Sequence, residues 1–148
     1  MKTLFVLILG LLPAVALAGL GDPEVRILEK FGPSVKETES SGVGERLLFY
    51  EKGGVGIGVE YWKGKAACLF YKKTIRSEKF TDAEIEALLE ESRGNSFWEN
   101  AHVIGEGKRW ARKDGGAVAH YIPSQDLLII MTDAFALERM KRKAASGQ

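Results

Sequence analysis

Apolar and other side chains alternate strictly along residues 55–62, VGIGVEYW. One alternate set is apolar and comprises Val55, Ile57, Val59 and Tyr61; the other comprises Gly56, Gly58, Glu60 and Trp62. A period of two is typical of a β-strand that turns one face to the core. Gly53 and Gly54 directly precede the run, and such a two-residue connection favours a tight hairpin turn. The pattern therefore predicts a strand entered from a hairpin.

Five further runs predict strands, because apolar and aromatic residues in them are bounded by turn residues. They cover residues 46–52, 66–73, 108–113, 117–122 and 127–132. Residues 34–45 are polar, and the segment that carries residues 95–100 and His102 shows no alternation before the run at 108–113. Both segments are predicted as loops.

Helices are predicted from their start signals. In the first, Asp22 would cap the start and Pro23 would take the first helical position. In the second, Thr81 and Glu84 have the spacing of a capping box. A short terminal helix is expected at the start of the basic tail, residues 133–148.

The order of these elements repeats along the chain. A shift of 62 residues (86 − 24) superposes Glu24 on Glu86, Glu29 on Glu91, Gly32 on Gly94, and Gly53-Gly54 on Gly115-Gly116. This predicts an internal duplication, with units at about residues 22–73 and 81–132. The expected fold class is α+β: two tandem α-β-β-β units form one antiparallel sheet with helices packed on one face. Residues 19–148 would form a single domain.

Residues 1–18 have the layout of a secretory signal peptide. Lys2 precedes an apolar core, Pro13 breaks it, and Ala16 and Ala18 supply the small residues of a cleavage site. We expect cleavage after Ala18 and export of the protein, which would be secreted or periplasmic. No stable membrane insertion is expected after cleavage.

The charge and the cysteine content exclude one class of partner and one kind of stabilising bond. The signal segment contributes only Lys2 to the 21 basic residues, so the remainder holds 20 (21 − 1) against 20 acidic residues. A neutral chain lacks the positive field of a nucleic-acid-binding protein, so no nucleic-acid partner is expected. Cys68 is the only cysteine, which excludes an internal disulfide.

The sequence contains no recognisable catalytic or metal-binding motif. No Gly-Lys-Ser/Thr and no helix directly follow the glycine run, so neither a P-loop nor a dinucleotide site is expected. His102 and His120 lack the spacing of metal ligands. We expect no cofactor, no metal and no catalytic residue. A small hydrolase or transferase that uses Cys68 or a histidine is the alternative.

The first helix and its end carry a family resemblance. Glu24, Val25, Phe31, Gly32 and Pro33, leading into a short antiparallel meander, resemble the small exported domains of SmpA/OmlA-type outer-membrane assembly lipoproteins. The doubled unit resembles the tandem-repeat architecture of the secreted β-lactamase inhibitory proteins. The chain has Gly19 where the lipoproteins carry a lipidated cysteine. The resemblance implies a protein-contact module and transfers no catalytic residue.

Aromatic residues and glycines indicate where a partner would bind. If helices cover one face of the sheet, the other would present Tyr50, Gly56, Gly58, Trp62 and Trp110. An open face with aromatic rings is a docking surface for a protein or glycan. The competing interpretation is that the aromatic rings fill the core. We expect an exported, non-enzymatic binding module with a protein partner; a small-ligand cup on the same face is a further alternative.

Overall fold

The computed structural model describes residues 19–40 and 42–147. These ranges contain three helices: α1 (Glu24–Phe31), α2 (Asp82–Glu91) and α3 (Asp133–Ala145). They also contain eight strands: β1 (Lys36–Glu39), β2 (Arg46–Lys52), β3 (Val55–Trp62), β4 (Lys65–Lys73), β5 (His102–Ile104), β6 (Gly107–Ala111), β7 (Ala117–Ile122) and β8 (Leu127–Thr132). The predicted signal peptide, residues 1–18, lies outside the described residues. In the described part of the chain, no helix is long and apolar enough to span a membrane.

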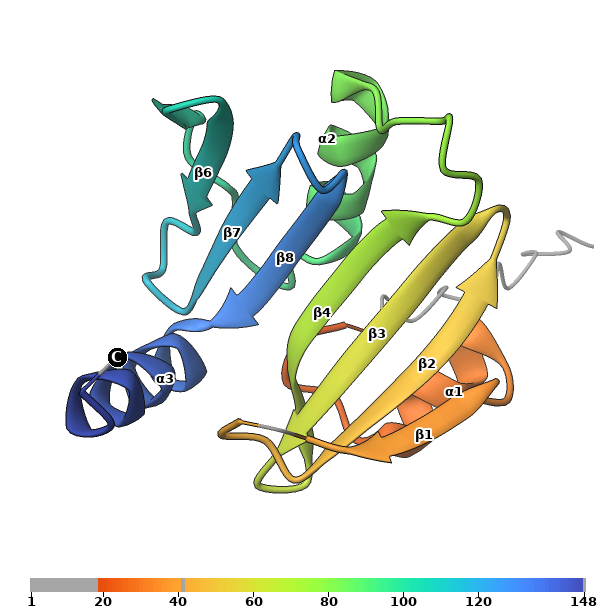
Figure 1. Ribbon diagram of the computed structural model, residues 1–148, viewed down its shortest axis with the longest axis vertical. Coiled ribbons are helices and arrows are strands. Elements are labelled where there is room, and N and C mark those ends of the chain that lie inside the picture. The colour runs from red at the N-terminus through yellow and green to blue at the C-terminus, as the bar shows by residue number, and fades with distance from the viewer. Residues whose placement is uncertain (1–18, 41, 148) are drawn as a thin grey trace, which may run out of the picture.

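All eight strands join one antiparallel sheet in the order β1-β2-β3-β4-β8-β7-β6-β5. The first four strands follow one another across the sheet, and the last four run in the reverse order, so β4 and β8 meet in the middle (Figure 1). There Leu69 of β4 is paired with Ile130 of β8, and both side chains are fully buried. The two halves of the chain therefore share one sheet and one core.

The α+β class and the antiparallel sheet are confirmed, and the six predicted strands correspond to β2, β3, β4, β6, β7 and β8. The loop prediction is wrong for β1 and β5, which form the two edges of the sheet. These strands are only four and three residues long, and their backbone groups pair with a neighbour whatever the side-chain pattern. The charged sequence KETE of β1 also discourages further pairing at that edge. Each half thus has four strands rather than three.

The two faces of the sheet are covered unequally. Ile27 of α1 and Ile85 and Leu89 of α2 join the main core, so both helices lie on one face, called here the covered face. α3 packs on the opposite, open face through Phe135. The helices that begin the two halves therefore share a face, as predicted, and the terminal helix lies on the other.

The starts of α1 and α2 differ in how well the sequence predicts them. The Thr81 hydroxyl accepts a hydrogen bond from the Glu84 backbone N–H, and the Glu84 carboxylate accepts one from the Thr81 N–H, so the capping box is confirmed. Both predictions for the start of α1 are wrong: Pro23 is the N-cap rather than the first helical residue, and among the described residues no side chain, including Asp22, caps the helix. The Asp22 carboxylate instead accepts a hydrogen bond of 2.7 Å from the Gly19 N–H.

Candidate functional site

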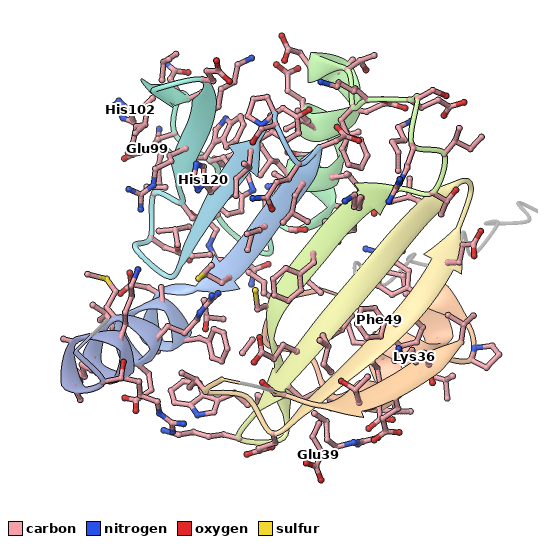
Figure 2. The ribbon with its side chains drawn as sticks, in the orientation of Figure 1. Lys36, Glu39, Phe49, Glu99, His102 and His120 are labelled. Atoms are coloured by element: carbon pink, nitrogen blue, oxygen red, sulfur yellow. The ribbon has the colours of Figure 1, made fainter. Side chains whose placement is uncertain are left out.

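Strand pairing aligns one row of residues across the open face. From β1 to β5 the row comprises Lys36, Phe49, Gly58, Phe70, Ile129, His120, Arg109 and His102. Figure 2 shows Phe49 towards one end of the sheet and the two histidines towards the other. The open face therefore has an aromatic half over β2–β4 and a polar, cationic half over β5–β7.

Between these halves, the open face is covered by the start of α3 and by Val43, which precedes β2. Phe135 is fully buried, and its ring centroid lies 5.7 Å from that of Trp62. Nearby, Glu60 is 7% exposed and accepts hydrogen bonds from the Ser40 hydroxyl and, at 3.1 Å, from the Gly44 N–H. A buried carboxylate needs such partners, and these two come from the segment between β1 and β2. Glu60 thereby holds Ser40 and Gly44 over the sheet.

A hollow of about 410 Å³ stays open over β2–β4. It is called here the glycine hollow, and its lining includes Val35, Phe49, Gly56 and Phe70. A Cβ atom at Gly56 would lie 3.7 Å from its nearest neighbour outside the adjacent residues, the Lys72 carbonyl oxygen, so the missing side chain leaves space. Gly58 differs, because the rings of Phe49 and Phe70 lie against it and it is buried. Aromatic cover of a strand glycine by its cross-strand neighbours is a recognised stabilising arrangement.

A second hollow of about 420 Å³ lies between α3 and strands β6–β8 and is called here the helix groove. Its apolar lining includes Val118, Ile129 and Met131 from the sheet and Ala136 and Met140 from α3. Its polar lining residues are Arg109, His120, Arg139 and Lys143. Burial and the neighbouring Arg109 guanidinium lower the pKa of His120, which favours the neutral imidazole.

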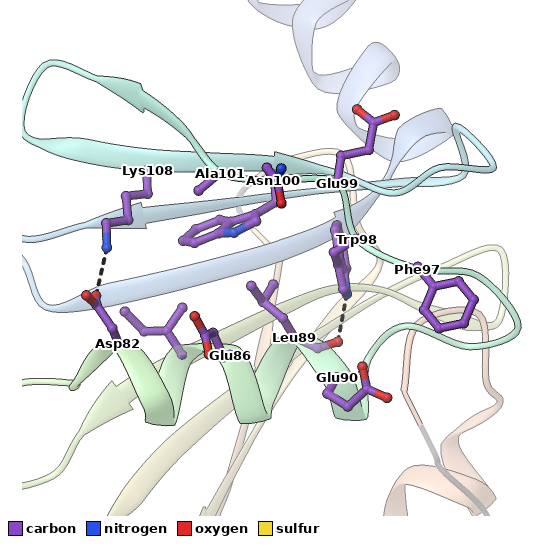
Figure 3. Close-up of a pocket in the computed structure, with 12 residues that line it drawn as sticks. Asp82, Glu86, Leu89, Glu90, Phe97, Trp98, Glu99, Asn100, Ala101 and Lys108 are labelled. Atoms are coloured by element: carbon purple, nitrogen blue, oxygen red, sulfur yellow. Dashed lines mark hydrogen bonds and ion pairs between the residues drawn. The ribbon is translucent and has the colours of Figure 1, made fainter.

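A third hollow of about 350 Å³ lies on the covered face, between α2 and the segment that leads to β6. Figure 3 shows the Trp98 indole N–H donating to the Leu89 carbonyl oxygen at 2.7 Å. The same view shows Lys108 paired with Asp82 at 2.8 Å. Both interactions connect α2 to the chain that follows it, which favours a structural role for this cleft.

The structure separates the five residues predicted to form one binding surface. Tyr50 and Trp110 are 2% and 9% exposed and lie in the main core, so their placement on the open face is wrong. Trp62 lies on the open face but packs in the smaller cluster beneath α3. Tyr50, Gly56 and Gly58 all line the glycine hollow, although the Tyr50 side chain is buried in the core, and of the two glycines only Gly56 leaves free space.

Phe49 and Phe70 flank the glycine hollow, and the sequence interpretation missed them. Phe49 could have been found from the hairpin. A two-residue turn at Gly53-Gly54 fixes the register of the flanking strands, which places Phe49 directly opposite Gly58. Phe70 lies on the far side of Gly58, where a bulge between Glu60 and Tyr61 shifts the register of β3 against β4. That irregularity has no signal in the sequence.

Cys68 lacks the surroundings of a catalytic nucleophile. The side chain is fully buried, and burial together with the nearby Glu60 carboxylate raises the pKa of its thiol. β8 lies between β4, which carries Cys68, and β7, which carries His120. Within the described residues, no group of three or more His, Cys, Asp or Glu side chains could hold a metal ion.

We expect the folded protein to resist thiol reagents at neutral pH, because the Cys68 thiolate is both disfavoured and inaccessible. The measurement is colourimetric thiol titration with and without denaturant. One thiol per chain should react in denaturant, and almost none should react in buffer. Fast labelling of the folded chain would contradict the burial and would support a nucleophilic Cys68.

Comparisons with protein-family models, curated proteins and solved structures found no match to this chain. The function is therefore argued from the geometry of the open face.

Proposed function

We propose that the protein is an exported, non-enzymatic binding module that holds a partner protein on the aromatic half of its open face. The observation that carries the proposal is the glycine hollow. Its space at Gly56 lies beside the half-buried rings of Phe49 and Phe70. Export is proposed from the signal-peptide layout of residues 1–18.

The chemistry of the hollow suits an apolar side chain of a partner. Aromatic residues around a desolvated pocket are typical of the few contacts that dominate protein–protein binding. Val35 is 69% exposed and extends the apolar surface at one side of the hollow. Glu51 and Lys72 lie at the same hollow with opposite charges, as in the polar rim of a protein interface. A protein-contact role is also what the resemblance to the outer-membrane assembly lipoproteins implies.

The rival proposal is a small hydrolase or transferase that uses Cys68 or a histidine. The burial of Cys68 argues against an enzyme that uses this cysteine as its nucleophile. An enzyme that uses His120 would need a reactive partner for this histidine. Its nearest charged neighbour in the row of residues across the open face is Arg109. We therefore retain the binding module as the proposed function.

A photo-reactive amino acid tests the binding surface in the exported compartment. Placed at Val35, beside the hollow, it should give one discrete cross-linked adduct. The control is the same amino acid at Val103, which is 74% exposed on β5 at the far edge of the sheet. No adduct at position 35, or the same adduct from both positions, would argue against the glycine hollow as the docking surface.

A further inference from the structure

Three cations line the helix groove, and none has an acidic partner among the described residues. Arg109 comes from β6, and Arg139 and Lys143 come from α3. None of them takes part in any ion pair found among the described residues. Glu138, an acidic neighbour on α3, is paired with Arg142 at 3.3 Å. The groove therefore carries excess positive charge in a chain whose total charge is close to zero.

The interior of the groove is apolar and adjustable. Val118, Ile129 and Met131 of the sheet are half-buried there, and Met140 is 67% exposed. Ala136, a small residue on the α3 side, leaves the space open. Methionine side chains adapt their shape readily to aliphatic ligands. The volume of about 420 Å³ lies within the range of roughly 300–1,000 Å³ found for small-molecule sites.

We propose that the helix groove binds a single-chain fatty acid, with the aliphatic chain between α3 and the sheet and the carboxylate among Arg109, Arg139 and Lys143. The apolar lining alone would accept many ligands, but the three cations select an anionic head. A carboxylate can accept charge-assisted hydrogen bonds from the guanidinium groups, and these are stronger than hydrogen bonds between neutral groups. This site lies on the other half of the open face and goes beyond the proposed protein-docking function.

His120 provides a reporter for this site. It lines the groove, and its Nε2 atom packs close to Gly107, 3.1 Å from where a Cβ atom of that residue would lie. The chain has only two histidines, so the NMR signal of His120 can be followed beside that of His102. A bound carboxylate should shift the His120 signal strongly and should raise its pKa, because the anion offsets the field of Arg109. The His102 signal should move little, since His102 is not among the lining residues.

Binding is tested by calorimetry and NMR on protein purified from the exported fraction, with dodecanoate below its micelle concentration. We expect one saturable site. Dodecyltrimethylammonium, which has the same chain and a cationic head, and acetate, which has the head alone, should bind at least tenfold more weakly than dodecanoate. Arg139→Gln should weaken dodecanoate binding about tenfold, as expected for the loss of a charge-assisted contact.

Matched variants separate the site from general charge effects. Lys141→Gln removes an exposed cation from the same helix outside the groove and should leave binding unchanged. Ala136→Trp should fill the groove and abolish binding. Gly56→Val should leave dodecanoate binding unchanged, because it alters the glycine hollow only. A failure of the fatty-acid site is therefore distinguishable from a failure of the protein-docking surface.

Three results would overturn the fatty-acid site. The first is equal binding of dodecanoate and dodecyltrimethylammonium. The second is unchanged dodecanoate binding in both Arg139→Gln and Ala136→Trp. The third is binding to phosphatidylglycerol vesicles without binding to monomeric dodecanoate, which would make α3 a membrane-surface helix instead.

Discussion

Ile130→Ala is expected to destabilise the whole protein by about 3 kcal/mol, within the roughly 2–5 kcal/mol typical of Ile→Ala at a buried site. Ile130 is fully buried on β8 and pairs with the equally buried Leu69 of β4, at the junction of the two halves. Truncation removes apolar contacts and leaves a cavity between residues that both halves contribute. Denaturant unfolding should show a lower midpoint, with all probes changing in one transition.

Ile129→Ala is the matched control for this variant. Ile129 is the adjacent residue on the same strand, but it lies half-buried on the open face. The same loss of atoms should cost only about 1 kcal/mol there, because part of the side chain already contacts solvent. Equal costs for the two variants, or separate transitions for the two halves in Ile130→Ala, would contradict one shared core.

Phe135→Ala is expected to release α3 from the open face. The Phe135 side chain is fully buried against Trp62 and its neighbours, and Phe→Ala at buried sites typically costs about 3–5 kcal/mol. Because α3 docks on the open face through Phe135, the lost energy first appears as undocking of the helix. Far-UV circular dichroism should therefore show less helix before global unfolding. The helix groove would disappear with it, and dodecanoate binding should be lost.

Leu137→Ala controls for changes in α3 itself. Leu137 lies on the same helix two residues later and is 49% exposed. Its truncation should change the unfolding free energy by no more than about 0.5 kcal/mol, the usual range for surface positions. A cost for Leu137→Ala as large as that for Phe135→Ala would mean that α3 does not dock through Phe135.

Strict alternation predicts which side of a strand is buried only where the two sides differ. Along β3 they do: Ile57, Val59 and Tyr61 are buried in the main core, as the pattern indicates. Along β2 both sides are apolar, because Phe49 lies between Leu48 and Tyr50. The alternation therefore does not assign a side to Tyr50. Long-range packing places it under α1, where its ring centroid lies 5.7 Å from that of Phe31.

The features that the sequence did not predict, two edge strands and the helix groove, depend on contacts between distant segments. β1 and β5 are strands because β2 and β6 offer them backbone partners. The helix groove combines residues of β6, β7, β8 and α3, and no local spacing connects Arg109 with Arg139. The internal duplication itself stays a prediction, since strand order alone does not establish it.

The most direct test of the central claim uses Gly56→Val. An added Cβ at Gly56 meets only ordinary contacts, at 3.7 Å from the Lys72 carbonyl oxygen, and valine is favoured in strands. The variant should therefore be as stable as the original or more stable by up to about 1 kcal/mol, while its side chain fills the glycine hollow. The measurement is the affinity of both proteins for the partner cross-linked at position 35. The account predicts at least tenfold weaker binding by Gly56→Val at undiminished stability; unchanged affinity would contradict it.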